Sequence, residues 1–297
     1  MNEADRQYKQ IIDKIINEGY SNQGEEVRTV WKDGEPAFTK SILAESMRFS
    51  NNQLPILTTK KVAWKTAIRE LLWIWQKKSN QVEELRQMNV KIWNEWEQED
   101  GTIGKAYGYQ LAKRNRRYPV EKLKTDLLDP RNTAISGETI ELDQVDYLIQ
   151  ELIANPSSRR HITMLWNPDE LDEMSLTPCV YETQWHVKAG KLHLEVRCRS
   201  NDMGLGNPFN VFQYNVLQRM IAQVTGYELG EYIFHIGDAH IYERHIEPLK
   251  EQVSRESHSA PELFINPAIK SFYDFTIEDF NLSDYQHGDK VQMEIAI

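Results

Sequence analysis

The run KLHLEVRCR, residues 191–199, alternates apolar and polar side chains along its whole length. Successive side chains of a β-strand point to opposite faces, so its four apolar residues, from Leu192 to Cys198, share one face and its charged residues share the other. Ala189-Gly190 separates this run from a second strand-like run at 180–187, which predicts a β-hairpin. A strand face that carries several charges indicates water, a ligand pocket or a partner surface on that side.

Beyond the hairpin, apolar spacing and capping residues predict further elements. Helices are expected at 9–18, 41–49, 66–77, 81–88, 143–155 and 210–224. Strands are expected at 161–166, 231–236 and 271–277. Because strands and helices do not alternate as in βαβ units, the fold class is expected to be α/β or α+β, with a mixed β-sheet flanked by helices.

Residues at the ends of these segments act as start and stop signals. The helix at 66–77 is apolar on nearly all sides, which indicates a buried helix. Asn80 together with Glu83 resembles a cap that opens the helix at 81–88. Asp143 is expected to cap the next helix, and Gly226 is expected to end the helix at 210–224.

The chain is expected to form one domain, residues 1–297, with a loop-rich lobe or insertion at about 81–142. The part at 113–142 is polar and contains two prolines and a glycine, which favours an insertion over a separate domain.

Composition excludes several classes of protein. The chain has only two cysteines, Cys179 and Cys198, so a disulfide framework is not expected and a cytoplasmic, reducing location is. Neither a signal peptide nor an apolar run of about 20 residues is present, so no membrane segment is expected. The formal net charge of -10 argues against a broad nucleic-acid surface, which needs an extended basic face.

Two compact basic spots stand out in this acidic chain. They are Arg159-Arg160 and the run Arg197-Cys198-Arg199-Ser200. Arginine beside a hydroxyl suits one small anion such as phosphate, because guanidinium donates two parallel hydrogen bonds. Surface charge is the simpler explanation of each pair, and the residues alone leave both open.

Cys179 follows Pro178 at the start of the hairpin. A buried cysteine is most often a small core residue. Nucleophilic chemistry requires a thiolate, which nearby positive charge stabilises, and Arg199 lies on the paired strand. Cys198 alternates with leucines and is expected to be structural.

Four other residues carry two interpretations each. Glu70 lies in the apolar helix, where it either pairs with Arg69 or Lys65 at the surface or points inward with a raised pKa and relays protons. Asn210 either caps a helix or pairs with the edge of a base. His240 and Tyr242 share one side of an extended segment and either pack in the core or bind a sugar hydroxyl. The histidine and carboxylate spacings predict no metal site. The residues alone therefore indicate a cytosolic enzyme with a candidate cysteine nucleophile and a candidate phosphate site.

Several motifs resemble the thymidylate synthase family over nearly the whole chain. Their order and spacing match the family pattern as well. They are LPILTTKKVAWKTAIRELLWIW, NVKIWNEWEQEDGTIGKAYGYQ, SSRRHITMLWNPDELDEMSLTPC, RSNDMGLGNPFN and GDAHIY.

This resemblance implies that the chain methylates dUMP to dTMP with 5,10-methylenetetrahydrofolate as cosubstrate and without a metal. Cys179 would attack carbon 6 of uracil, which is covalent catalysis. Glu70 would lead a water network that transfers protons, and Tyr107 would help to remove the proton of carbon 5. The implied catalytic residues are Cys179, Glu70, Tyr107, Arg199, Asp202 and Asn210.

The resemblance also implies the binding residues. Those for dUMP would be Arg28, Arg159, Arg160, Arg199, Ser200, Asn201, Asp202, Asn210, His240 and Tyr242. Those for the reduced folate would be Ile92, Trp93, Trp96, Asp202, Gly206, Phe209 and Ala296, the last in a C-terminal segment that closes over the ligands. Arg159 and Arg160 would reach the phosphate of the neighbouring subunit in a homodimer whose two sheets pack back to back.

Three positions depart from the family pattern. Val180 stands where many relatives carry histidine, Cys198 where many carry glutamine, and Leu111 where the pattern has tryptophan. The alternatives are a dUMP hydroxymethylase of the same fold, which adds water where a synthase delivers hydride, and a non-catalytic nucleotide-binding protein.

Overall fold

A computed structural model describes residues 2–132, 135 and 137–297. Its main feature is a six-stranded sheet in the order β1-β2-β8-β7-β6-β5. The strands are β1 (Tyr20–Ser21), β2 (Thr39–Phe49), β5 (His161–Met164), β6 (Val180–Lys188), β7 (Lys191–Asp202) and β8 (Glu228–Tyr242). β7 and β8 run parallel and the other neighbours run antiparallel, so the expected mixed sheet is confirmed.

The hairpin that the sequence predicts is β6–β7. Its turn is Ala189-Gly190, with φ angles of 50° and 75°. Both angles lie in the left-handed region that tight hairpin turns require, which is the reason for a glycine at the second position. The apolar face from Leu192 to Cys198 is buried, as the alternation predicts.

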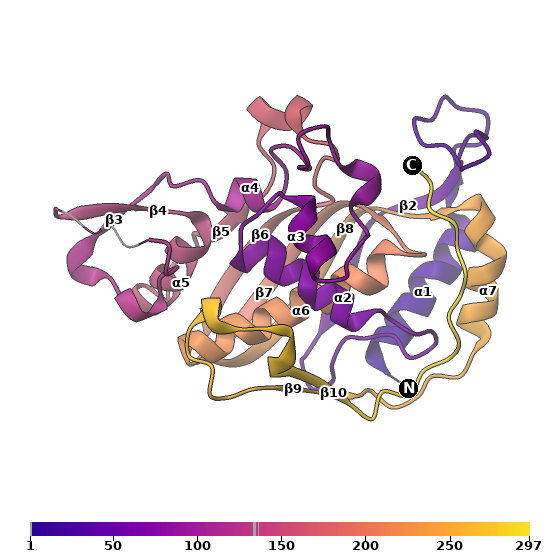
Figure 1. The fold of residues 1–297 in the computed structure, drawn as a ribbon. Helices are drawn as coiled ribbons and strands as arrows, with labels where there is room; N and C mark the ends of the chain where they lie inside the picture. The colour runs from indigo at the N-terminus through magenta and orange to yellow at the C-terminus, as the bar shows by residue number, and fades with distance from the viewer. Residues whose placement is uncertain (1, 133–134, 136) are drawn as a thin grey trace.

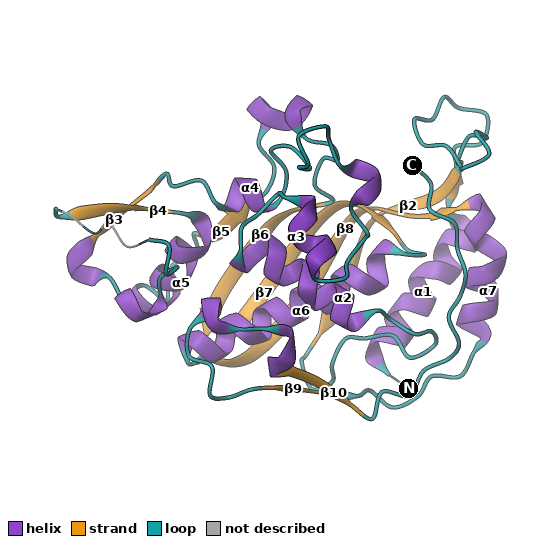
Figure 2. Cartoon of the chain, in the orientation of Figure 1, coloured by secondary structure: helices purple, strands orange, loops and turns teal. Residues whose placement is uncertain are grey.

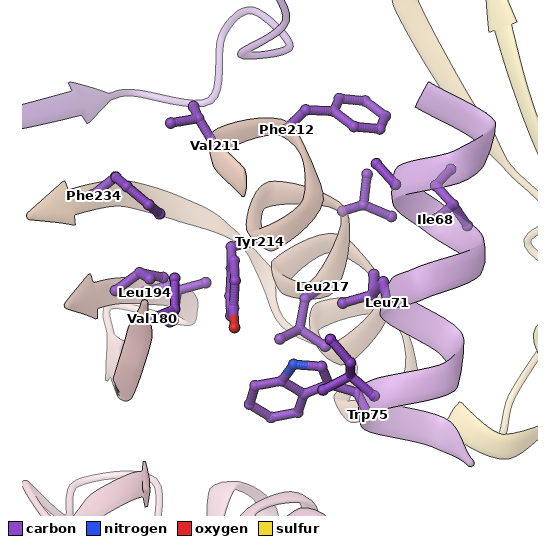
Figure 3. Packing of buried hydrophobic residues seen from close by; sticks show 14 of the residues in the cluster. Ile68, Leu71, Trp75, Val180, Leu194, Val211, Phe212, Tyr214, Leu217 and Phe234 are labelled. Atoms are coloured by element: carbon purple, nitrogen blue, oxygen red, sulfur yellow. The ribbon is translucent and has the colours of Figure 1, made fainter. Parts of the chain in front are cut away.

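Helices cover one face of the sheet (Figure 1). The central one is α6 (Gly206–Thr225), which ends at Gly226 with a φ of 78°, as expected. Beside it lie α1 (Glu3–Glu18) and α7 (Ile246–Ser254), which contact each other. Figure 3 shows α6 between α2 (Trp64–Leu71) and the sheet, with Ile68 and Leu71 on one side and Leu194 and Phe234 on the other.

The predicted apolar helix at 66–77 is α2 continued by a π-helix, Leu72–Gln76. Trp73, Ile74 and Trp75 of this π-helical turn are all buried, as the lack of a polar face predicts. The short helix α3 (Val82–Gln87) follows, but Asn80 does not cap it. Its side chain donates to the carbonyl oxygen of Gly104 at 2.7 Å instead.

The remaining helices are α4 (Gly108–Leu111) and α5 (Gln144–Ala154). Asp143 caps α5 as expected, because its carboxylate accepts hydrogen bonds from the backbone N–H groups of Val145 and Asp146 at 3.0 and 2.9 Å.

Two predicted elements are wrong. Residues 41–49 belong to strand β2, not to a helix. Residues 271–277 form 3₁₀ turns at Phe272–Asp274 and Ile277–Asp279, next to a small ladder of β9 (Glu262–Ile265) and β10 (Phe280–Ser283). Phe272 and Phe275 are both buried there, with the three-residue spacing of a 3₁₀ turn rather than the alternation of a strand.

A small lobe projects from the sheet at β3 (Arg116–Pro119) and β4 (Thr139–Leu142), as Figure 2 shows. It has its own apolar cluster of Tyr118, Leu128 and Leu142, separate from the main core. The division into one domain with a lobe at about 81–142 stays a prediction.

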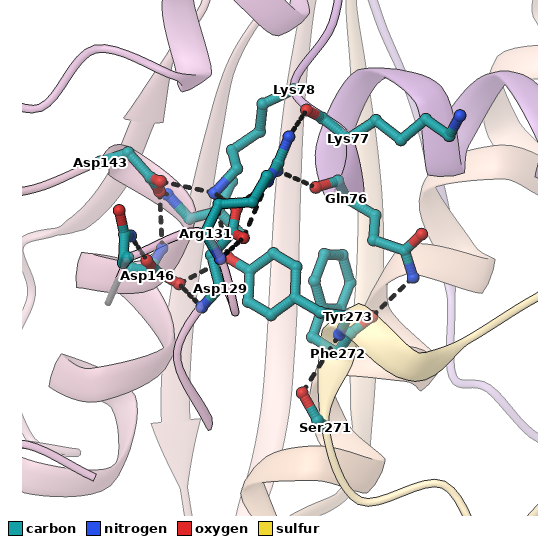
Figure 4. Close-up of polar contacts among 12 residues, drawn as sticks. Gln76, Lys77, Lys78, Asp129, Arg131, Asp143, Asp146, Ser271, Phe272 and Tyr273 are labelled. Atoms are coloured by element: carbon teal, nitrogen blue, oxygen red, sulfur yellow. Dashed lines mark hydrogen bonds and ion pairs between the residues drawn. The ribbon is translucent and has the colours of Figure 1, made fainter. Parts of the chain in front are cut away.

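Buried ion pairs attach the lobe to the rest of the chain (Figure 4). The amino group of Lys78 lies 2.6 Å from Asp129 and 2.5 Å from Asp143, and all three side chains are less than 5% exposed. Arg131 binds Asp129 and donates to the backbone carbonyl oxygens of Gln76 and Lys77. The end of the π-helical turn is therefore tied to the lobe by charge.

Among the described residues, no helix has both the length and the apolar character that crossing a membrane requires.

Candidate active site

A cavity of about 590 Å³ opens between the π-helical turn, α6, the ends of β7 and β8, and the C-terminal residues. It brings together all of the predicted site residues except two. Those that line it are Arg28, Glu70, Ile92, Trp93, Trp96, Tyr107, Cys179, Arg199, Ser200, Asn201, Asp202, Gly206, Phe209, Asn210, His240, Tyr242 and Ala296. Such convergence of polar groups in an apolar hollow is typical of a small-molecule site.

Cys179 lies at the edge of the hairpin, directly before β6. Its backbone N–H donates to the Tyr107 hydroxyl at 3.2 Å, and its carbonyl oxygen accepts from the backbone N–H of Arg199 at 2.8 Å. Burial raises the pKa of the Cys179 thiol, and the positive charge of Arg199 opposes that rise. The hairpin therefore sets the cation beside the thiol, as the strand pairing predicts.

The guanidinium of Arg199 is held by the loop ahead of the nucleophile. It donates to the carbonyl oxygens of Pro178 and Thr177 at 3.0 and 2.9 Å, and also to the Thr177 hydroxyl at 2.9 Å. No carboxylate of the described residues pairs with it, so its charge remains available to a thiolate or a bound anion.

Tyr107 has an unusual backbone conformation at the wall of the cavity. Its φ is 47°, which a bulky residue rarely adopts, so packing must hold it there. The next residue, Gly108, lies against the backbone of Ser79, where a Cβ atom would come within 2.3 Å of the carbonyl oxygen. This close approach fixes the chain so that the Tyr107 ring meets the Trp93 ring edge-on, with 5.1 Å between the ring centroids.

Glu70 points inward. One carboxylate oxygen accepts from the indole N–H of Trp93 at 2.6 Å, and the other accepts from the side-chain amide of Gln213 at 2.6 Å. Surface pairing with Arg69 is therefore wrong. Burial raises the pKa of Glu70 in spite of these two donors. Gln213 was not expected at the site, although it lies one helical turn beyond Asn210 on α6.

Asn210 is not a helix cap, because α6 begins at Gly206. The turn before α6 is closed by Asp202, whose carboxylate accepts from the backbone N–H groups of Gly204 and Leu205 at 2.8 and 3.1 Å. A relay of amides orients Asn210: Asn207 donates to Asn201 at 2.8 Å, and Asn201 donates to the Asn210 oxygen at 3.1 Å.

The consequence for Asn210 is a fixed amide orientation. Its oxygen keeps one further lone pair, and its NH₂ group makes no hydrogen bond to the described residues. Such an amide matches a carbonyl oxygen adjacent to a ring N–H.

His240 and Tyr242 lie on the same side of β8, with their rings edge-on at 5.4 Å. The Nδ1 atom of His240 is 2.9 Å from an Asp238 oxygen. A carboxylate partner at Nδ1 favours the proton on that nitrogen, which leaves Nε2 as an acceptor. The pair can therefore hydrogen-bond a hydroxyl group in the cavity.

The C-terminal residues close one side of the cavity. Ile297 and Val30 exchange two backbone hydrogen bonds, at 2.8 and 2.9 Å. The carbonyl oxygen of Glu294 lies 2.7 Å from the Nε2 atom of His245. These contacts hold Ala296 against the opening, next to Arg28.

Comparisons with known proteins decide the family. The thymidylate synthase family model matches residues 6–297. Thymidylate synthase 1 of Bacillus subtilis strain 168 is 64% identical, with 100% of each chain covered, and thymidylate synthase of Bacillus phage phi3T is 63% identical with the same coverage. The solved structure of thermostable thymidylate synthase A from Bacillus subtilis matches at a TM-score of 0.89 and 64% identity, with 99% of each chain covered. The chain belongs to the thymidylate synthase family.

The thymidylate synthase reaction is the reductive methylation of dUMP to dTMP, so the chain is a methyltransferase. The cosubstrate is 5,10-methylenetetrahydrofolate, which supplies the one-carbon unit and the hydride and leaves as dihydrofolate. Among the described residues, no group of three or more His, Cys, Asp or Glu side chains is arranged to hold a metal ion.

Arg159 and Arg160 are the two predicted thymidylate synthase site residues that the cavity does not include. Both side chains are exposed, in the turn between α5 and β5. One chain alone therefore does not bring them to Cys179.

The departures from the thymidylate synthase pattern are all buried. Val180 and Cys198 are partners across the hairpin, so two of them face each other. The Cys198 thiol donates to the carbonyl oxygen of Ser200 at 3.2 Å, and burial raises its pKa well above the usual value. This environment fits the expected structural role. Leu111 is fully buried in α4.

Proposed function

We propose that Cys179 is the nucleophile of the thymidylate synthase reaction in this chain. The observation that carries the proposal is a thiol that lines the cavity beside the guanidinium of Arg199, which forms no ion pair with a carboxylate of the described residues. The sulfur would form a bond to carbon 6 of dUMP, and the ring electrons would move to carbon 5 and oxygen 4. Carbon 5 would then attack the one-carbon unit of the folate, and loss of the carbon 5 proton would break the bond between that unit and the folate nitrogen. Hydride from the tetrahydrofolate so released would reduce the exocyclic carbon to methyl as the thiolate leaves carbon 6, which gives dTMP and dihydrofolate.

The remaining residues would bind and orient dUMP. Arg28, Arg199 and Ser200 supply cationic and hydroxyl donors at one end of the cavity, which suits the phosphate. The oriented amide of Asn210 suits the oxygen 4 and N3–H edge of uracil. His240 and Tyr242 would hydrogen-bond the 3′-hydroxyl of the sugar.

Glu70 and Tyr107 would handle protons. Burial raises the pKa of the Glu70 carboxyl, which makes it a better proton donor and acceptor for water that would reach oxygen 4. Tyr107 lies beside Cys179 and would assist removal of the proton of carbon 5.

The folate would stack on the aromatic wall. The rings of Trp93 and Trp96 meet edge-on, with 5.7 Å between their centroids. Ile92 and Phe209 extend this apolar surface. A flat ring system buries most area on such a wall. Asp202 and Gly206 lie at the turn into α6, and Ala296 would close the cavity over the ligands and exclude water.

Substitution of the nucleophile tests the proposal. Cys179→Ala should lower kcat for dTMP formation by at least about a thousandfold, because Cys179 is the one thiol among the described residues that line the cavity. The variant should still bind dUMP, measured by calorimetry, since Arg199 and Asn210 remain. Cys198→Ala is the matched control and should keep turnover. Turnover in Cys179→Ala close to that of the parent chain would exclude the assignment.

We also propose a homodimer with the two sheets back to back. The sheet face away from α6 carries partly exposed residues and a second hollow lined by Met164, Trp166 and Tyr181. Leu43 is 72% exposed, which is unusual for a leucine on a strand. In such a dimer, Arg159 and Arg160 would reach the phosphate site of the partner. We place the protein in the cytoplasm, because its two free thiols suit a reducing compartment.

A further inference from the structure

A separate hollow, of about 480 Å³, lies at the start of α1 and beside β9, away from the hollow on the outer face of the sheet. Figure 1 marks the N-terminal end of the chain, which is close to it. It shares no lining residue with the catalytic cavity. Its walls are polar: Asn51, Asn52 and Gln53 come from the segment after β2, and Ser259 comes from the segment before β9. Its volume lies within the range of small-molecule sites.

Arg219 is the cation of this hollow. It extends from α6, and its Nε–H donates to the side-chain oxygen of Asn215 at 2.8 Å. Its two terminal nitrogens make no hydrogen bond and no ion pair with the described residues. Burial lowers the pKa of Arg219 to about 10, which reflects a cation taken from water without an anion to replace it.

Neutral amides hold the arginine in place. Asn215 donates to the Asn51 oxygen at 2.6 Å. Asn51 in turn donates to Gln218 at 2.9 Å and to the carbonyl oxygen of Gly230 at 2.6 Å. The guanidinium is therefore oriented before any ligand arrives, and no carboxylate of this network neutralises it. Preorganised donors of this kind lower the entropic cost of binding.

The only carboxylate among the described residues that line the hollow is Glu262, which is exposed and makes no ion pair with Arg219. The arrangement parallels that of Arg199, which also faces a cavity without a carboxylate partner. A planar guanidinium with two free N–H edges binds the oxyanion of a carboxylate or a phosphate through parallel hydrogen bonds.

We propose that this hollow is a second, non-catalytic anion site, in which Arg219 binds the oxyanion group of a small metabolite. The amides of Asn52 and Gln53 and the hydroxyl of Ser259 would complete the hydrogen bonds around it. The site stabilises the fold when occupied, because a ligand that binds only the folded chain shifts the unfolding equilibrium.

The test is thermal unfolding in potassium phosphate or potassium citrate, with ionic strength held constant by potassium chloride. Saturating dUMP is present throughout, so that the catalytic phosphate site is already filled. The unfolding midpoint of the unaltered chain should rise with one or both anions. A response to phosphate alone assigns a phosphate ligand, and a response to citrate alone assigns a carboxylate. A response to both assigns a general oxyanion site.

Arg219→Met should raise the anion concentration at half-saturation by about tenfold or more. This is the usual effect of losing a charge-assisted hydrogen-bonding pair. Its midpoint without anion should equal or exceed that of the unaltered chain, because the substitution removes a buried unpaired charge. Arg48→Met, at an exposed arginine that pairs with Glu231, is the matched control and should keep the response.

Glu262→Gln removes the one carboxylate among the described lining residues and should lower the anion concentration at half-saturation. An equal response in the unaltered chain and Arg219→Met, or no response to either anion in the unaltered chain, would overturn the proposal. Neither result would bear on Cys179 or on dTMP formation, which are measured separately.

Discussion

The environment of Cys179 is decided by single residues. Val180 and Cys198 face each other across the hairpin where many relatives carry histidine and glutamine. In this chain both positions are buried, and neither Val180 nor Cys198 leaves a strongly polar side-chain group without a partner. Valine at position 180 offers no side-chain hydrogen bond to the cavity, and under the proposed function the amide relay to Asn210 would remain to orient uracil.

Gln213 is the residue whose removal should reveal the state of Glu70. Gln213→Leu removes one of two donors to a buried carboxylate, which should raise the pKa of Glu70 further. When the pKa of a carboxyl is higher in the folded chain than in the unfolded chain, the folded state is favoured most at a pH below the unfolded pKa. That contribution is lost as pH rises through the folded pKa. The variant should therefore lose about 1–3 kcal/mol of unfolding free energy at pH 8 and less at pH 5, measured with urea.

Glu70→Gln combined with Gln213→Leu is the control, because it removes the titrating group. A deficit of the same size at pH 5 and pH 8 in Gln213→Leu would contradict the argument, as would pH dependence that persists in the double variant.

The sequence predicts part of this site for a clear reason. Strand alternation and one hairpin turn place Arg199 beside Cys179, and this pairing needs no long-range information. Gln213 is missed because a helical glutamine is most often a surface residue, and only the packing of α6 on α2 turns it toward Glu70. The residues alone leave a helix cap open as one interpretation of Asn210, because the start of α6 depends on the turn that Asp202 closes.

At the scale of elements, irregular backbone explains where the sequence misleads. Ala44 in β2 has a φ of 59° and is skipped in the ladder to β8, although the pairing keeps the same register on either side of it. Ile42 before it and Met47 and Phe49 after it pack on the core. This local distortion of the backbone interrupts the period of two, so the apolar spacing of this strand resembles that of a helix.

The junction of the lobe with the π-helical turn depends on Lys78. Burial would raise the pKa of Asp129, but hydrogen bonds from Arg131 and Lys78 outweigh it and hold the pKa well below its usual range. That stabilisation is present above the unfolded pKa and is lost as pH falls through the folded value. Lys78→Met should therefore cost about 3–5 kcal/mol of unfolding free energy at neutral pH, because it leaves buried carboxylates without their cation.

Hydrogen exchange should locate that loss at residues 116–142, with faster exchange there than in β7 or β8. Lys77→Met is the matched control: Lys77 is exposed and pairs with Glu84 at the surface, so its loss should change stability by less than about 1 kcal/mol. Equal costs in the two variants would show that the buried pairs do not anchor the lobe.

At the scale of the whole molecule, a single chain leaves the site incomplete. The cavity gathers residues from Arg28 to Ile297, yet Arg159 and Arg160 lie outside it, exposed at the turn before β5. No pattern within one sequence states where a second copy sits, so their role comes from the family resemblance alone. If they act across the interface, each site requires two chains.

Mixing two inactive variants tests this arrangement. Arg160→Ala supplies an intact Cys179, and Cys179→Ala supplies an intact Arg160. In a mixed dimer one site has both groups and the other has neither. Random exchange makes half of the dimers mixed, so activity should recover to about a quarter of that of the unaltered chain, measured as dTMP formed. Mixing Cys179→Ala with Cys179→Ser should restore nothing. If subunit exchange is verified by mass and the first mixture also stays inactive, each chain binds dUMP without its partner's arginine.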